Sequence, residues 1–281
     1  MKNSVALVKL WLYWGLSFFM LVSSPLNAKE QAKIALIIDD MGIHKELSLS
    51  ALSLPGAVTY SFLPFTKYSH SLSKLAYQNG NELMLHAPMQ AIAIQEQEVN
   101  ELKSNMHVHS FEQLFIDQLN EIPHISGVNN HKGSLLTQDY QAMSLIMQLM
   151  KTQHSKSLFF VDSKTDPASI AQKAAQDFGV NALSRDVFLD HNNPSKEVIR
   201  QQFKKLIALA QRNGSALGIA HPRINTLLVL KEELNKMASY NVDLVSVSEL
   251  MLQTRKKRID RPIKKVNIKD KEVTFGEYDI F

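Results

Sequence analysis

Short apolar runs alternate with amphipathic stretches along most of this chain, and this alternation restricts the fold more than any other feature. The first run, residues 34–38, is apolar throughout, as expected of a strand that is buried on both faces of a parallel sheet. The amphipathic segments 67–78 and 196–212 are each followed by an Asn-Gly pair, which is typical of a helix end. The pattern therefore predicts repeated βα units. The predicted strands are residues 34–38, 58–63, 82–85, 127–129, 158–161, 182–184, 216–220 and 242–247.

About eight such units are the number that closes a (β/α) barrel, so the sequence predicts an α/β barrel of about seven to eight strands. An open, doubly wound sheet is the alternative. No glycine-rich phosphate loop follows a predicted strand, because residues 39–42 read Asp-Asp-Met-Gly where a dinucleotide site needs bare backbone. Residues 29–253 contain no repeat or Pro-rich linker and are predicted to form one domain.

Residues 1–28 have the layout of a secretory signal, with Lys2 and Lys9 preceding or flanking an apolar core and small or polar residues leading to Ala28. The apolar core, about a dozen residues, is shorter than the roughly 20 that a spanning helix prefers. We predict export to the periplasm with cleavage after Ala28. An uncleaved inner-membrane anchor is the alternative, since Leu26 stands where a small residue is preferred. The chain has no cysteine, which excludes disulfides and thiolate metal ligands.

Residues 254–281 are predicted to form a basic, flexible tail that accounts for much of the net charge of +4. Because the excess charge is concentrated in this tail, the sequence pI of about 9.0 does not indicate a nucleic-acid partner. Electrostatic contact of the tail with a membrane surface or an anionic polymer is the alternative to a merely solvated tail. The basic residues are Arg255, Lys256, Lys257, Arg258, Arg261, Lys264, Lys265, Lys269 and Lys271.

Acids and histidines stand directly after the predicted strands. In a βα barrel the carboxyl ends of all strands open onto one face, so these side chains are expected to converge. Each alone has an ordinary explanation, such as a helix cap, an Asx turn, a local ion pair or a hydrogen-bonded histidine. Their shared location is what points to a site. The residues are Asp39, Asp40, His86, Asn129, Asn130, His131, Asp162, Arg185, Asp186 and His221.

Carboxylates and imidazoles buried together cost several kcal/mol for each unpaired charge, and a divalent cation compensates for this cost. We predict that Asp40, His86 and His131 hold one such ion, zinc first, with nickel, cobalt or iron as alternatives. Asp39 is predicted to act as a base, since neighbouring side chains in a strand diverge. His221 is predicted to protonate a leaving group, and the arrangement hydrolyses an amide or ester. Supporting or substrate-binding roles are predicted for Asn130, Asp162 and Arg185.

Five segments in order resemble the divergent polysaccharide deacetylase family: residues 34–42, 85–89, 127–134, 160–163 and 220–222. The resemblance spans roughly residues 33–250. It implies a NodB-like, deformed (β/α) barrel and a metal-dependent carbohydrate deacetylase ancestry. In the wider family the first acid of the paired motif is the base, the second is a metal ligand, and a late histidine is the acid. These roles fall on Asp39, Asp40 and His221.

The chain departs from the family pattern in two places. Ordinary members carry a second metal histidine where this chain has Gln90, four residues after His86, so His131 is expected to take its place. They also carry an arginine that orients the base, for which Arg185 is the candidate. The leading expectation is a periplasmic hydrolase that removes acetyl or other acyl groups from an envelope carbohydrate or peptidoglycan-like substrate. A catalytically silent, metal- or glycan-binding envelope protein on the same fold is the alternative.

Overall fold

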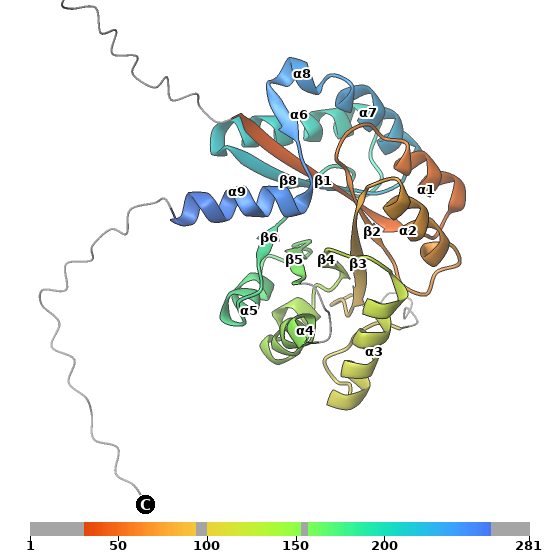
Figure 1. The fold of residues 1–281 in the computed structure, drawn as a ribbon, viewed down its shortest axis with the longest axis vertical. Helices are drawn as coiled ribbons and strands as arrows, with labels where there is room; N and C mark the ends of the chain where they lie inside the picture. The colour runs from red at the N-terminus through yellow and green to blue at the C-terminus, as the bar shows by residue number, and fades with distance from the viewer. Residues whose placement is uncertain (1–30, 94–99, 153–156, 260–281) are drawn as a thin grey trace, which may run out of the picture. The chain divides into compact units, whose positions relative to one another are not determined.

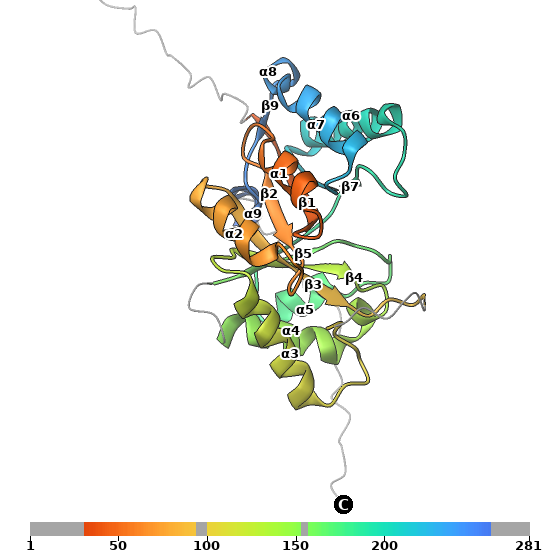
Figure 2. The same ribbon diagram turned by 90° about the vertical axis from the view of Figure 1, so that its right-hand side faces the viewer.

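A sheet of parallel strands forms the centre of the fold (Figures 1 and 2). The computed structural model describes residues 31–93, 100–152 and 157–259, so the predicted signal segment 1–28 lies outside the described residues. The strands pair in the order β6-β5-β4-β3-β2-β1-β8-β7, and β9 also pairs with β1. Their bounds are β1 Ala32–Met41, β2 Thr59–Phe62, β3 Glu82–Met89, β4 Gly127–Lys132, β5 Phe159–Asp162, β6 Ala182–Ser184, β7 Val187–Phe188, β8 Ser215–Ala220 and β9 Val242–Leu244.

The two edges of this sheet meet at a link of two residues. Strands β6 and β7 stand at opposite ends of the pairing order, but only Arg185 and Asp186 separate them in the chain. The backbone N–H of Arg185 donates to the carbonyl of Asp162 in β5 (3.0 Å), and that of Asp186 donates to the carbonyl of Leu217 in β8 (2.9 Å). The sheet therefore curls into a deformed, incompletely paired barrel. This confirms the predicted α/β barrel over the open, doubly wound sheet.

Helices cover the outer side of the sheet. Helix α2 packs against β2 and β3, α5 against β5 and β6, and α6 against β1, β7 and β8. In the described part of the chain, none of the helices is both long enough and apolar enough to cross a bilayer. The helices are α1 Lys45–Leu52, α2 Ser69–Gln78, α3 Val108–Glu121, η1 Leu136–Gln138, α4 Tyr140–Thr152, α5 Ala171–Asp177, α6 Lys196–Asn213, α7 Ile224–Leu234, α8 Met237–Tyr240 and α9 Val247–Ile259.

Helix α6 shows why these segments become helices. Ser195 precedes it and accepts a hydrogen bond from the backbone N–H of Val198 (3.5 Å), and Gly214 ends it in the left-handed region at φ 86°. Its buried residues recur at helical spacing and form the stripe that faces β8. These residues are Ile199, Phe203, Leu206, Ile207 and Ala210.

Alternation along β1 divides the core into two clusters. Ile34, Leu36 and Ile38 belong to the large cluster under the outer helices. Ala35 and Ile37 belong to an inner cluster, which includes Leu217 and Ile219 of β8 and Val247 and Leu250 of α9. The first turns of α9 thus fill the inside of the curled sheet, and Figure 1 shows this helix crossing beside β1 and β8.

The inner cluster determines which side chains can reach the open end of the barrel. Successive side chains of a strand point to opposite faces, so the residue two positions beyond an inward residue also points inward. Beyond the inward residues Ile37, Met84, Val161 and Ile219, the next inward positions are polar. These positions are Asp39, His86, Ser163 and His221.

Several predicted boundaries differ from the structure. Strands β1, β3 and β4 continue to Met41, Met89 and Lys132, so the predicted site residues Asp39, Asp40, His86 and His131 lie inside strands and not after them. The ladder continues through the pairs His86 with Asn129 and Pro88 with His131, because polar inward residues with partners do not interrupt a strand. At the other end, β9 stops at Leu244. Helix α9 runs past the predicted tail boundary at residue 254 to Ile259, and residues 260–281 lie outside the described residues.

Candidate metal centre

An irregularity at the end of β1 turns Asp40 toward the inside of the barrel. The pairing of β1 with β2 shifts register between Ile38 and Met41, and Asp40 adopts a positive φ of 56°. In a regular strand Asp39 and Asp40 would point to opposite faces. A bulge that re-aims one side chain, as is common next to functional sites, lets both carboxylates face the same site.

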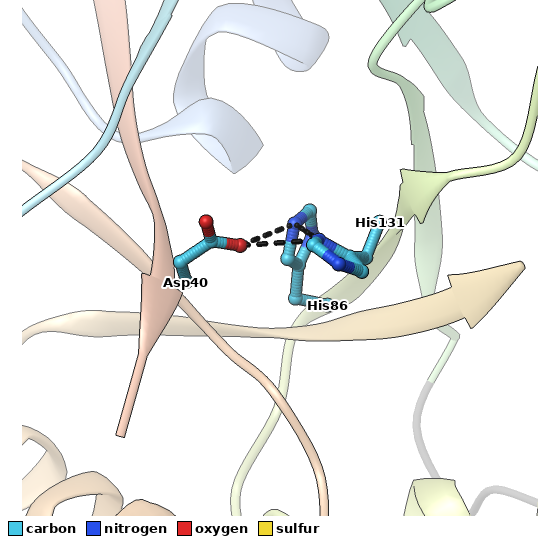
Figure 3. A group of neighbouring side chains, drawn as sticks. All are labelled: Asp40, His86 and His131. Carbon is cyan, nitrogen blue, oxygen red and sulfur yellow. Dashed lines mark hydrogen bonds and ion pairs between the residues drawn. The ribbon is translucent and has the colours of Figure 1, made fainter. Parts of the chain in front are cut away.

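Asp40, His86 and His131 come together from three strands (Figure 3). Asp40 Oδ1 lies 3.3 Å from His86 Nε2 and 3.1 Å from His131 Nδ1. The two ring nitrogens are 3.1 Å apart. The rings meet edge to face, with centroids 4.9 Å apart. One oxygen and two nitrogens therefore surround a common point, as expected from the sequence.

The chemistry of these three atoms fits a cation. His86 Nδ1 lies 2.9 Å from the side-chain oxygen of Asn129, which only accepts, so Nδ1 carries the proton and Nε2 presents a lone pair. Asp40 Oδ1 is buried and receives no well-aligned hydrogen bond from the described residues. Although burial opposes its ionisation, the contacts of Asp40 with His131 and His86 hold its pKa well below the usual value. A carboxylate oxygen and two imidazole nitrogens are ligands that zinc accepts.

Asp39 lies next to this centre, where the side-chain amide of Asn129 holds it. Its Oδ1 accepts a 2.8 Å hydrogen bond from Asn129 Nδ2 and lies 3.7 Å from His86 Nδ1. The residue is 2% exposed, and burial raises the pKa of its carboxyl against the opposing effects of His86, His221 and Asn129. A carboxylate with a raised pKa is a stronger base at neutral pH.

His221 faces the centre from the other side of β1. Its Nδ1 donates to Asp190 Oδ1 (2.9 Å), and its Nε2 lies 3.7 Å from Asp40 Oδ2. Asp190 is fully buried and also accepts from Thr226 Oγ1 (2.8 Å) and from the backbone N–H of His221 (3.0 Å). Burial disfavours the imidazolium, but the hydrogen bond to Asp190 and the charges of Asp40, Asp190 and Asp39 outweigh it and raise the pKa of His221.

Residues 36–251 match the divergent polysaccharide deacetylase family. The chain belongs to this family. Its relatives include the uncharacterized protein YibQ of Escherichia coli, 33% identical over 230 residues that cover 82% of this chain and 70% of the relative. An uncharacterized protein of Haemophilus influenzae is 33% identical over 220 residues, 78% of this chain and 77% of that protein.

A solved structure shares the fold. The uncharacterized protein ATU2773 of Agrobacterium tumefaciens superposes with a TM-score of 0.74 at 20% identity, over 80% of this chain and 92% of that one. The match of the family to nearly the whole described region confirms the resemblance that the five sequence segments indicate. The family is one of carbohydrate deacetylases, which are hydrolases of C–N bonds.

The polysaccharide deacetylase motif is altered at Gln90, and the structure shows where that side chain goes. Gln90 Oε1 accepts hydrogen bonds from the backbone N–H and the hydroxyl of Ser104, both at 3.1 Å. Gln90 therefore contacts the loop that follows β3. His131, two residues beyond Asn129 on the inward side of β4, lies at the centre instead.

Arg185, the candidate for orienting Asp39, directs its described hydrogen bonds to backbone carbonyls. Its Nε donates to the carbonyl of Ser163 (2.7 Å) and its Nη2 to that of Lys164 (2.9 Å), because Arg185 lies at the junction of the sheet edges. Asp162 likewise supports the same loop, accepting from the backbone N–H of Lys164 (2.8 Å) and from Ser169 Oγ (2.8 Å).

Asn130 also has a supporting position. It donates to the carbonyl of Lys132 (2.7 Å) and accepts from the backbone N–H of Ser163 (2.9 Å), which fixes the loops after β4 and β5. The sequence places Asn129 among the converging residues but assigns it no role, and it does not indicate Asp190. The inward alternation of β4 would have indicated a role for Asn129. Asp190 follows β7, a strand of two residues that leaves no periodic signal.

Proposed function

We propose that this chain is a metal-dependent deacetylase that hydrolyses acetyl groups, or related acyl groups, from an envelope carbohydrate such as a peptidoglycan-like glycan. The observation that carries the proposal is the convergence of Asp40, His86 and His131, whose ligand atoms all lie within 4.8 Å of one another. Membership of the polysaccharide deacetylase family supports the substrate class.

The proposed cofactor is one divalent cation, zinc first, with nickel, cobalt or iron as alternatives. Three protein ligands leave room for further ligands, as in catalytic zinc sites. When bound, the cation would supply Lewis acidity, which lowers the pKa of water and polarises a carbonyl. No cysteine competes for the metal, since the chain contains none.

The remaining steps of the proposed reaction use two side chains. Asp39, buried and held by Asn129, would accept the proton of the attacking water. His221 would give a proton to the leaving amine from Nε2, because its Nδ1 is engaged with Asp190. The raised pKa of His221 favours the protonated ring that this role needs.

Elemental analysis of the purified protein tests the cofactor. We expect about one equivalent of metal, lost from the variants Asp40→Ala, His86→Ala and His131→Ala. Asp39→Asn is the matched control, since Asp39 stands outside this ligand set and the variant should keep its metal. Full metal content in all three ligand variants would contradict the proposal.

Acetate release tests the reaction. Acetylated chitooligosaccharides and peptidoglycan fragments serve as substrates, and metal-loaded Asp39→Asn should lose at least about a hundredfold in kcat. If wild-type protein loaded with metal releases no acetate from a broad panel but binds a glycan saturably, the chain is a catalytically silent binding protein. That outcome is the alternative function, and the replacement of the usual second histidine by Gln90 motivates it.

The proposed location is the periplasm, on the basis of residues 1–28 alone. Fusion of these residues to a reporter that is active only after export would test it. Electrostatic contact through the basic residues 254–281 is a separate proposal. Deletion after Gln253 should then abolish salt-sensitive binding to anionic vesicles.

A further inference from the structure

One buried amide connects the proposed base with the proposed metal ligands. Asn129 Nδ2 donates to Asp39 Oδ1 (2.8 Å), and on the other side of the same group Asn129 Oδ1 accepts from His86 Nδ1 (2.9 Å). We propose that Asn129 is a positioning residue that orients Asp39 and determines which nitrogen of His86 faces the metal. This inference rests on the proposed function.

The direction of the amide follows from its partners. A base must be a carboxylate, which accepts hydrogen bonds and donates none, so the group that faces Asp39 is the NH₂. The carbonyl oxygen then lies on the opposite side, where it meets His86 Nδ1 and the hydroxyl of Ser61 (2.6 Å). The second hydrogen of the NH₂ is directed to Ser163 Oγ (3.1 Å).

All four hydrogen-bonding positions of the Asn129 side chain are therefore used. An amide offers two donors and two acceptor lone pairs, and here the partners are Asp39, Ser163, Ser61 and His86. The residue has no exposed surface. A reversed amide would face a carboxylate with its own oxygen, so the environment permits one orientation only.

This orientation selects the tautomer of His86. Because the carbonyl of Asn129 can only accept, the proton of neutral His86 lies on Nδ1 and the lone pair on Nε2. Nε2 is the atom that lies 3.3 Å from Asp40 Oδ1 and 3.1 Å from His131 Nδ1. Without the carbonyl, the Asp40 carboxylate would favour a proton on Nε2, and an N–H would then point at the cation site. Hydrogen bonds to the second nitrogen fix metal-binding histidines in this way.

The amide also holds the base without adding charge. Arg185 donates from Nε and Nη2 to the carbonyls of Ser163 and Lys164, whereas Asn129 donates to Asp39 Oδ1. The negative charges of Asp39 and Asp40 then balance one divalent cation. The neutral amide of Asn129 binds both the Asp39 carboxylate and the His86 imidazole, so the orientations of these two side chains depend on each other.

The tautomer is measured directly in metal-free protein by long-range ¹H–¹⁵N NMR of ¹⁵N-labelled histidine. We expect wild-type His86 to carry its proton on Nδ1 and Asn129→Ala to shift it to Nε2. Ser61→Ala removes a different partner of the same oxygen and is the matched control, which should keep Nδ1–H. Wild-type protein with Nε2–H, or Asn129→Ala that retains Nδ1–H, would overturn the inference.

Asn129→Asp separates the two roles and retains the shape of the residue. It keeps an oxygen for His86 but replaces the amide donor with an acid that shares one proton with Asp39, so we expect Nδ1–H, metal affinity within about tenfold of wild type and a kcat at least about a hundredfold lower because Asp39 is no longer a free base. A kcat equal to that of wild type would contradict the orientation of Asp39 by Asn129. Asn129→Ala should bind zinc about tenfold to a hundredfold more weakly in a chelator competition.

Failure of the inference is distinguishable from failure of the proposed function. The NMR measurement requires neither bound metal nor turnover. If wild-type protein binds no metal and releases no acetate, the proposed function fails while the tautomer still reports on Asn129. If Asn129→Ala does not fold, the wild-type spectrum and Asn129→Asp still decide.

Discussion

His221 Nδ1 donates a 2.9 Å hydrogen bond to Asp190, a carboxylate with no exposed surface. This contact leaves Nε2 directed toward the metal centre, 3.7 Å from Asp40 Oδ2. We predict that Asp190→Asn lowers kcat about 10²-fold to 10⁴-fold, because the amide can reverse the His221 tautomer. Metal content should be unchanged. Steady-state kinetics with elemental analysis checks this, and a variant that loses metal in parallel with activity would contradict a separate role for the pair.

Gln90 is predicted not to replace His131. The double variant His131→Ala with Gln90→His restores the family's usual histidine spacing, but the side chain at residue 90 is directed to Ser104 in the loop after β3. We expect the double variant to bind zinc as weakly as His131→Ala alone, measured by chelator competition. Recovery of wild-type affinity would mean that residue 90 can reach the centre.

Glu233 is predicted to stabilise the fold in a pH-dependent way. Burial opposes its ionisation, but hydrogen bonds from Tyr240, Lys236 and Arg200 outweigh burial and lower its pKa. Its contribution is therefore complete above the unfolded-state pKa of about 4.3 and is lost as the pH falls through the lower folded-state value.

The Glu233→Gln variant tests this contribution. At pH 7 its free energy of unfolding should be about 1–3 kcal/mol lower than that of wild type, and the difference should shrink below about pH 4. Urea denaturation at several pH values measures it. Glu232→Gln, which removes a half-exposed ion pair with Arg200, should cost less than about 1 kcal/mol. A pH-independent difference for Glu233→Gln would show that packing, and not charge, is responsible.

We predict that glycine at residue 127 is required for the packing of β4 against Phe159, two residues before Asn129. A Cβ at this position would lie 2.3 Å from the ring of Phe159, inside the inner cluster. Gly127→Ala should lower the free energy of unfolding by about 1–3 kcal/mol and weaken metal binding. Gly80→Asn is a suitable control, because no atom lies within 4 Å of its Cβ position and asparagine tolerates φ of 79°. Equal stability of Gly127→Ala and wild type in thermal unfolding would contradict the prediction.

The parts of the fold that the sequence predicts well are those determined by apolar periodicity. The strand positions follow from buried runs such as residues 34–38, and the meeting of Asp40, His86 and His131 follows from parallel strands that end at one face. The ends of β3 and β4 do not follow, because polar residues with buried partners continue these strands. A rule based on apolar runs ends them too early.

Apolar periodicity does not predict local backbone geometry or the hydrogen-bond partners of the site residues. The positive φ of Asp40 depends on how β1 pairs with β2, which the segment Asp-Asp-Met does not reveal. The role of Asn129 depends on Asp39, Ser61 and His86 from three strands and on Ser163, which directly follows β5. Residue type makes Arg185 a candidate for orienting Asp39, but it does not predict that Nε and Nη2 of Arg185 donate to nearby backbone carbonyls.

The two-residue link of Arg185 and Asp186 joins β6 and β7, the two edges of the curled sheet. Strands on one side of this seam carry His86 and His131, while Asp190 and His221 follow the strands on the other side. In the described sheet, no ladder of hydrogen bonds joins β6 to β7. The two residues between them, Arg185 and Asp186, therefore limit how far these two strands can separate. The pairing of β8 with β1 sets the distance between His221 and Asp40, so a longer link should loosen this seam and leave the candidate metal centre in place.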